Sequence, residues 1–161
     1  MSFIYAEKYR EDDSGRESIR ILCDTKVTPG RFTSAHFSEA GADLVKKYGI
    51  VKSTICCPEL CVSFAGNNTL YASKLFRQLN DMGSFETEDV SYYALRIHQE
   101  APSQDDIEFI VSYFMNGQLH IDCVKNGKLE RDCLFAHIGS EDAFHAFQRI
   151  RLSTGGDPAK Q

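Results

Sequence analysis

The sequence lacks the features that mark membrane and secreted proteins. It contains no run of about 18 apolar residues, so we expect no membrane-spanning helix. The first residues, MSFIYAEKYREDD, carry charges where a secretory signal would need an apolar stretch. We therefore expect a cytoplasmic protein that has no membrane partner.

Positive charge is also scarce. The 161 residues include 18 Lys and Arg against 23 Asp and Glu, which gives a net charge of −5. Nucleic-acid binding depends on clustered Lys and Arg, and no basic run occurs, so we expect no nucleic-acid partner. Repeats and low-complexity segments are absent too. The length fits one domain, which we place at residues 1–150, with 151–161 as a flexible tail.

A second group of metal ligands is missing as well. The chain has six cysteines, and Cys56, Cys57 and Cys61 cluster tightly enough to suggest a metal site. However, a structural zinc site needs a second pair of Cys or His ligands, and no pair with matching spacing follows. We therefore expect no metal, and cysteines that are reduced and packed as small core residues.

The sequence does contain a regular order of strand and helix patterns. Residues 3–10 and 18–28 predict two strands around the polar turn EDDSG. Residues 49–56 and 60–65 predict a second strand pair around a Pro-Glu turn. Apolar residues then recur at helical spacing, which predicts helices over residues 68–82 and 87–100.

The second half of the chain predicts a run of strands before a final helix. Residues 107–115, 118–124 and 129–137 predict strands, and two Asn-Gly pairs between them are strong hairpin signals. Gly139 and Ser140 then open a last helix. Antiparallel hairpins with helices grouped between them predict an α+β layered sandwich.

Three segments carry a family resemblance. ILCDTKVT (21–28) joins an apolar run to an acid, a Lys and a Val-Thr ending. VKSTICCPELCVSFAGN (51–67) joins a Lys-bearing strand to a turn and an Ala-Gly pair. CLFAHIGSEDAFHAF (133–147) ends a strand in Gly-Ser and enters a helix. In this order, over most of residues 2–150, they resemble the proteasome β-type and bacterial ATP-dependent peptidase branch of the N-terminal-nucleophile hydrolases.

The resemblance implies a four-layer αββα sandwich of antiparallel sheets. Members of the family continue for another stretch of helices and strands, which supplies a catalytic Asp and a second Ser. This sequence ends at Gln161, and its first turn, EDDSGRES, is several residues longer than usual. We therefore expect the family fold without its last C-terminal elements, and an active site that this chain leaves incomplete.

The resemblance also implies peptide hydrolysis by the first residue of the mature chain. In the family the hydroxyl of this residue attacks a peptide carbonyl, and its own α-amine takes the proton. The ordinary pKa of an α-amine is about 7.7–8, so the amine can act as a base near neutral pH. Ser2 would hold this position once Met1 is removed. Lys52 would depress the pKa of neighbouring groups, and Asp24 would hold the Lys52 ammonium in place.

Five further positions follow from the same resemblance. The N–H of Gly66 would donate to the oxyanion, although a strand-to-helix turn also favours Gly there. Ser140 resembles the active-site serine of the family, but its place at the head of a helix favours N-capping. Val27 and Thr28 would border the substrate channel. Phe64 would lie at the base of the pocket for the residue preceding the cut, and would leave room only for a small side chain.

Family members work as rings that enclose their active sites and receive unfolded substrate from an ATPase. The resemblance therefore implies a homo-oligomer, an ATPase partner, a peptide or unfolded protein as substrate, and no cofactor. Two alternatives stay open. One is a Cys–His protease that uses Cys61 or Cys23 as its nucleophile, although no signature surrounds them. The other is a catalytically inactive relative that keeps the scaffold for assembly or regulation, with Met1 retained.

Overall fold

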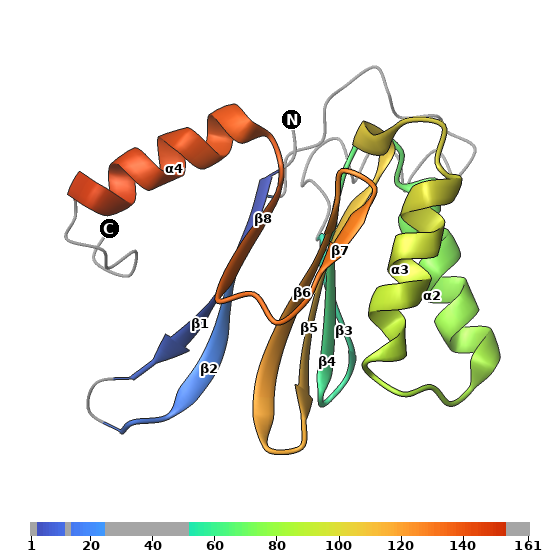
Figure 1. Ribbon diagram of the computed structural model, residues 1–161, viewed down its shortest axis with the longest axis horizontal. Coiled ribbons are helices and arrows are strands. Elements are labelled where there is room, and N and C mark those ends of the chain that lie inside the picture. Colours follow the sequence, from blue (N-terminus) through green and yellow to red (C-terminus); the bar gives the residue numbers. More distant parts are fainter. Residues whose placement is uncertain (1–2, 12–13, 25–51, 154–161) are drawn as a thin grey trace, which may run out of the picture.

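The computed structural model describes residues 3–11, 14–24 and 52–153 and is drawn in Figure 1. Its elements are β1 (Phe3–Arg10), β2 (Glu17–Cys23), β3 (Ser53–Cys57), β4 (Leu60–Ala65), α2 (Leu70–Met82), α3 (Asp89–Glu100), the 3-10 turn η2 (Gln104–Asp106), β5 (Glu108–Met115), β6 (Gln118–Lys125), β7 (Lys128–Glu130), β8 (Phe135–Gly139) and α4 (Glu141–Ser153). The described residues thus form an α+β protein with two antiparallel sheets and three α-helices.

The strands form one sheet of three and one of five. The three-stranded sheet has the order β2-β1-β8, and the five-stranded sheet has the order β3-β4-β5-β6-β7. Asn116-Gly117 and Asn126-Gly127 form the turns on either side of β6, and all four residues have positive φ. Asn and Gly adopt this left-handed conformation more readily than other residues, which is why the pair favours a tight hairpin. The hairpins predicted from these two pairs are confirmed.

The single strand predicted for residues 129–137 is wrong. The segment forms two strands, and β7 belongs to the five-stranded sheet whereas β8 belongs to the three-stranded sheet. Asp132 between them has a φ of 53°, which ends the extended conformation. The N–H of Asp132 donates to the Asp122 carboxylate at 2.9 Å, and the N–H of Cys133 donates to the Ile121 carbonyl at 2.7 Å. These two bonds hold the chain against β6 where it crosses between the sheets.

The two sheets pack on each other through small and β-branched side chains. Alternate residues of β1 and β8 face the five-stranded sheet, where they meet side chains of β4, β5 and β6. The buried side chains of this layer are Ile4, Ala6, Ala65, Ile110, Ile121, Cys123, Ala136 and Ile138. Because side chains alternate along a strand, this layer fixes which residues face the helices on the other side of each sheet.

The far side of the five-stranded sheet is covered by α2 and α3 (Figure 1). The core there combines residues of β4 and β5 with the buried side chains of both helices. The helical members are Ala72, Leu75, Leu79, Val90, Ala94 and Ile97, which recur at the spacing predicted from the sequence. This packing orients the end of β4, where the chain turns towards α2.

The three-stranded sheet carries α4 on its other side, away from the five-stranded sheet (Figure 1). The ring of Phe147 lies 4.8 Å from Tyr5 and 5.7 Å from Phe3 between centroids. Arg151 near the end of α4 forms an ion pair with Glu7 at 2.7 Å and also contacts the Tyr5 hydroxyl. The helix is therefore attached to β1 by aromatic contacts and by a charged pair.

The burial of the helix-side core can be tested with two Phe residues of the same strand. Phe109 is 0% exposed and Phe114 is 46% exposed. We expect Phe109→Ala to lower the free energy of unfolding by roughly 3–5 kcal/mol, because it removes a buried ring and leaves a cavity. Phe114→Ala should change it by no more than about 0.5 kcal/mol. Urea unfolding measures both, and equal losses would contradict the described packing.

Candidate functional site

Lys52 and Asp24 form a contact between the two sheets. Lys52 precedes β3 in the five-stranded sheet, and Asp24 follows β2 in the three-stranded sheet. The Lys52 ammonium, whose side chain is only 5% exposed, donates to Asp24 Oδ1. A buried ammonium without a partner would be costly, so the carboxylate offsets its loss of water. The pair proposed from the sequence is therefore formed.

The same Asp24 carboxylate holds the start of β1. Its second oxygen, Oδ2, accepts the N–H of Phe3 at 3.1 Å. The backbone N–H of Asp24 donates in return to the Phe3 carbonyl, also at 3.1 Å. Asp24 thus connects the buried ammonium of Lys52 to the first described residue of the chain.

Gly66 lies at the end of β4 and is required there by close packing. Its φ is +150°, and a Cβ atom at this position would lie 2.2 Å from the carbonyl oxygen of Asp106. Because the neighbouring atoms are backbone, a larger residue would force η2 and β4 apart. The structural interpretation of Gly66 is confirmed, and it leaves a role for its N–H open.

Ser140 caps the last helix. Its hydroxyl accepts the N–H of Ala143 at 3.3 Å, and its carbonyl accepts the N–H of Phe144 at 3.1 Å. The N-capping interpretation is therefore confirmed. Ser140 also follows Gly139, which pairs with Phe3 across β1 and β8. It lies one residue from the strand pair that Asp24 holds.

Phe64 faces the helices. Its side chain is 7% exposed, belongs to the core under α2 and α3, and meets the edge of Phe76 at 6.1 Å between centroids. Its N–H donates to the carbonyl of Lys52 at 2.9 Å, so the two residues are neighbours in the backbone. The remaining predicted site residues, Ser2, Val27 and Thr28, lie outside the described residues.

Glu108 is a buried acid that the sequence reasoning missed. It begins β5, pairs with Ala65 of β4, and is 7% exposed. Its Oε2 accepts the N–H of Gly139 at 2.7 Å. Burial raises the pKa of this carboxyl, although the Gly139 N–H and the nearby Lys125 lower it. The available signal was a single Glu in the otherwise apolar run IEFIV, on the same strand face as Ile110.

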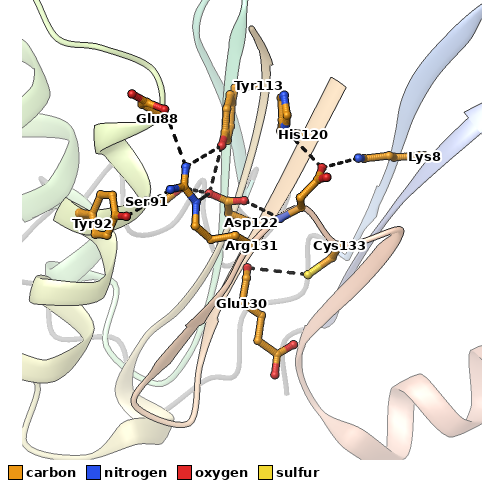
Figure 2. A network of polar contacts seen from close by, with 11 residues as sticks. Lys8, Glu88, Ser91, Tyr92, Tyr113, His120, Asp122, Glu130, Arg131 and Cys133 are labelled. Atoms are coloured by element: carbon orange, nitrogen blue, oxygen red, sulfur yellow. Dashed lines mark hydrogen bonds and ion pairs between the residues drawn. The ribbon is translucent and has the colours of Figure 1, made fainter. Parts of the chain in front are cut away.

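A second polar network lies further along the five-stranded sheet (Figure 2). Asp122 is 0% exposed and accepts hydrogen bonds from the Ser91 hydroxyl at 2.7 Å and the Tyr113 hydroxyl at 3.3 Å. Arg131 forms an ion pair with the same carboxylate at 3.5 Å and donates to Tyr113 at 3.2 Å. These contacts join α3, β5 and β6 to the segment that follows β7, so they serve the crossing between the sheets.

The described histidines do not pair with thiols. His98 is buried, and its Nε2 accepts the N–H of Gly127 at 2.8 Å, which leaves Nδ1 to donate to the Ile107 carbonyl. His120 contacts Asp132, and burial raises the pKa of Cys61. A thiol with a raised pKa is a weak nucleophile near neutral pH. Within the described ranges, the contacts thus do not support a Cys–His catalytic pair.

The described residues contain no group of three or more His, Cys, Asp or Glu side chains that could hold a metal ion. Their helices include none that is both long and apolar enough to cross a bilayer. No protein-family model matches the sequence, and no curated protein matches it either. The function must therefore be inferred from the geometry around Lys52, Asp24 and the start of β1.

The environment of His137 predicts a pH dependence of stability. Its ring stacks on Phe144 at 3.7 Å between centroids, and its Nε2 lies 3.2 Å from Lys125 Nζ. Burial and the Lys125 charge lower the pKa of His137, although Glu141 opposes them. The unfolded chain therefore binds a proton at a pH where the folded chain does not. The folded state should lose stability as the pH falls from about 6.5 towards the lowered pKa.

Urea unfolding between about pH 8 and pH 5 measures this loss. We expect His137→Gln to lose less stability on acidification than the unaltered protein, because the group that resists protonation is gone. His145→Gln is the matched control, since His145 is exposed on α4 and makes only the smallest of the contributions that shift the pKa of His137, so the pH dependence should change much less. Equal slopes for the His137 variant and the unaltered protein would contradict the prediction.

Proposed function

We propose that this chain is a peptide hydrolase of the proteasome-like, N-terminal-nucleophile type. Ser2, exposed by removal of Met1, would be both nucleophile and base. One observation carries the proposal. The buried ammonium of Lys52 is bound by Asp24, and the same carboxylate binds the N–H of Phe3, the residue joined to Ser2 by a peptide bond.

The Lys52–Asp24 pair supports the proposal, because removing its charges from water costs free energy that the fold alone does not require. A buried ion pair contributes little net stability, and an apolar pair of similar size often does as well or better. A positive charge held near the chain start is useful, however, to an enzyme that develops negative charge there. Lys52 would favour the oxyanion and lower the pKa of the attacking hydroxyl, and Asp24 would fix the distance between the ammonium and β1.

The proposed reaction follows from these positions. The α-amine of Ser2 takes the proton of its own hydroxyl, and Oγ forms a bond to the carbonyl carbon of the peptide. The N–H of Gly66 donates to the oxyanion. The peptide nitrogen leaves with the proton from the α-ammonium, and water then hydrolyses the ester that remains on Ser2. The segment around Val27 and Thr28 would border the substrate site, whereas Phe64 packs under α2 and α3.

The arrangement of the layers supports the same class. Helices α2 and α3 lie outside the five-stranded sheet and α4 lies outside the three-stranded sheet, which is the order of an αββα sandwich (Figure 1). We propose a homo-oligomer that receives peptide or unfolded protein, with an ATPase as partner. Tyr92 of α3 is 50% exposed whereas Tyr93 packs against the core, so Tyr92 is available for contact with another subunit.

A non-catalytic scaffold is the second candidate function. Gly66 is explained by packing against Asp106, and Ser140 is explained by capping α4. Neither residue therefore requires catalysis. The two candidates differ at the chain start, since retention of Met1 would turn the α-amine of Ser2 into a peptide amide and leave its hydroxyl without the proposed base.

The first test concerns Ser2. We expect the intact mass of the purified protein to correspond to loss of Met1. Ser2→Ala should abolish both cleavage of fluorogenic peptide amides and labelling by a covalent N-terminal-nucleophile inhibitor, because no hydroxyl remains to attack. Circular dichroism should show an unchanged fold. Cys61→Ser and Cys23→Ser should keep activity. Loss of activity in the cysteine variants alone would favour a Cys–His enzyme, and inactivity of the unaltered assembled protein would favour the scaffold.

The second test compares two ion-paired lysines. Lys52→Met removes the buried ammonium but keeps an apolar stem, and it should lower kcat about 100-fold or more through lost electrostatic support. Lys8→Met is the control, because Lys8 pairs with Asp132 at 2.5 Å in another part of the three-stranded sheet. The control should keep its activity. Similar losses in both folded variants would show that Lys52 has no special role.

A further inference from the structure

Two buried or half-buried carboxylates hold the same strand pair from different sides. Phe3 of β1 pairs with Gly139 of β8. Asp24 accepts the N–H of Phe3 at 3.1 Å, and Glu108 accepts the N–H of Gly139 at 2.7 Å. Asp24 comes from the end of β2, whereas Glu108 comes from the facing five-stranded sheet. The start of β1 is thus fixed to both sheets by acids.

Glu108 holds a turn that needs to be fixed. Gly139 has a φ of +90°, a backbone conformation that residues other than Gly rarely adopt, and Ser140 follows it as the cap of α4. A shift of Gly139 would also displace Ser140, which follows it in the chain, and Phe3, which pairs with it across the sheet. The bond from Glu108 therefore sets the position of the β8–α4 turn relative to the chain start.

A purely structural role would not require an acid. The amide oxygen of a Gln could accept the Gly139 N–H without the cost of burying an ionisable group. The charged or titratable groups that face Glu108 are Lys125 and Cys123 of β6, His98 of α3 and Asp105 of η2. Burial raises the pKa of Glu108 although Lys125 and His98 lower it, so Glu108 holds its proton more tightly than an exposed Glu does. Ionisable groups of this kind are concentrated at functional sites.

We infer that Glu108 is a positioning residue of the proposed site, which holds the Gly139–Ser140 turn against the start of β1. The inference rests on the proposed function, because it assigns a second acid to the same site. Glu108 acts through the backbone of Gly139, and its ionisation changes the strength of that bond. A carboxylate accepts an N–H more strongly than a neutral acid does. The position of Phe3, which pairs with Gly139, is thereby linked to the protonation of Glu108.

Hydrogen exchange of the Gly139 amide tests the bond directly, without any substrate. In the full chain, Glu108→Ala should speed this exchange by about 13- to 160-fold beyond any global change, the loss expected for one bond to a charged acceptor. Glu108→Gln should restore most of the protection. Glu7→Ala is the matched control, because Glu7 is also buried, at 6% exposed, but pairs with Arg151 under α4. Glu7→Ala should change the exchange rate of the Gly139 amide only as much as it changes global stability.

The pH profile of peptide hydrolysis tests the functional role. Protonation of the Ser2 α-amine sets one fall of kcat on the acid side, and we expect a second fall at lower pH from Glu108. Glu108→Gln should fold and lose only the second fall, whereas Glu7→Gln keeps both. A profile of Glu108→Gln identical to the unaltered one overturns the inference, as does Gly139 exchange that responds equally to Glu108→Ala and Glu7→Ala. Failure of the proposed function has a different signature. The unaltered protein would then hydrolyse no peptide and bind no inhibitor, while Gly139 exchange still responded to Glu108→Ala.

Discussion

The packing of the two sheets on each other is the constraint on which the other features depend. Its side chains are mostly Ala and Ile, which lets the sheets approach closely. The close approach brings the end of β2 to the residue that precedes β3. Lys52 therefore reaches Asp24 across two sheets, and their ion pair is a product of the sandwich rather than of either hairpin. The helices on the outer faces then follow from the alternation of side chains along each strand.

Buried charge in the described residues gathers at a few defined places, and each has a geometric purpose. Asp122 and Arg131 hold the chain where it passes from β7 to β8. Glu7 attaches α4 through Arg151. Asp24 and Glu108, in contrast, converge on one strand pair at the start of the chain. The first group holds the chain at the crossing between the sheets, and the second attaches α4 to β1. The third serves neither purpose, and it binds the N–H groups of Phe3 and of Gly139, its partner across β1 and β8.

Much of this architecture could be predicted from local patterns. The Asn-Gly pairs and the helical spacing of α2 and α3 are dictated by backbone geometry within a few residues. The break between β7 and β8 could not be predicted, because it depends on Asp132 bonding to Asp122 ten residues away. Glu108 was missed for a similar reason. Its partner is an N–H 31 residues along the chain, and its burial depends on a facing sheet that one strand does not reveal. The Lys52–Asp24 pair was found only through a family resemblance.

The close contact between Gly66 and Asp106 changes what comparison with related sequences would mean. Any residue with a Cβ would meet a backbone oxygen there, so selection for a folded chain alone would keep this position constant. A constant glycine would then report the packing of η2 on β4, in an enzyme and in a scaffold alike. Lys52 is different, because an apolar residue could occupy its place without collision and without the cost of a buried charge. Among related sequences, some could keep Gly66 but replace Lys52. Such sequences would keep the fold without the ammonium that the proposed hydrolysis needs.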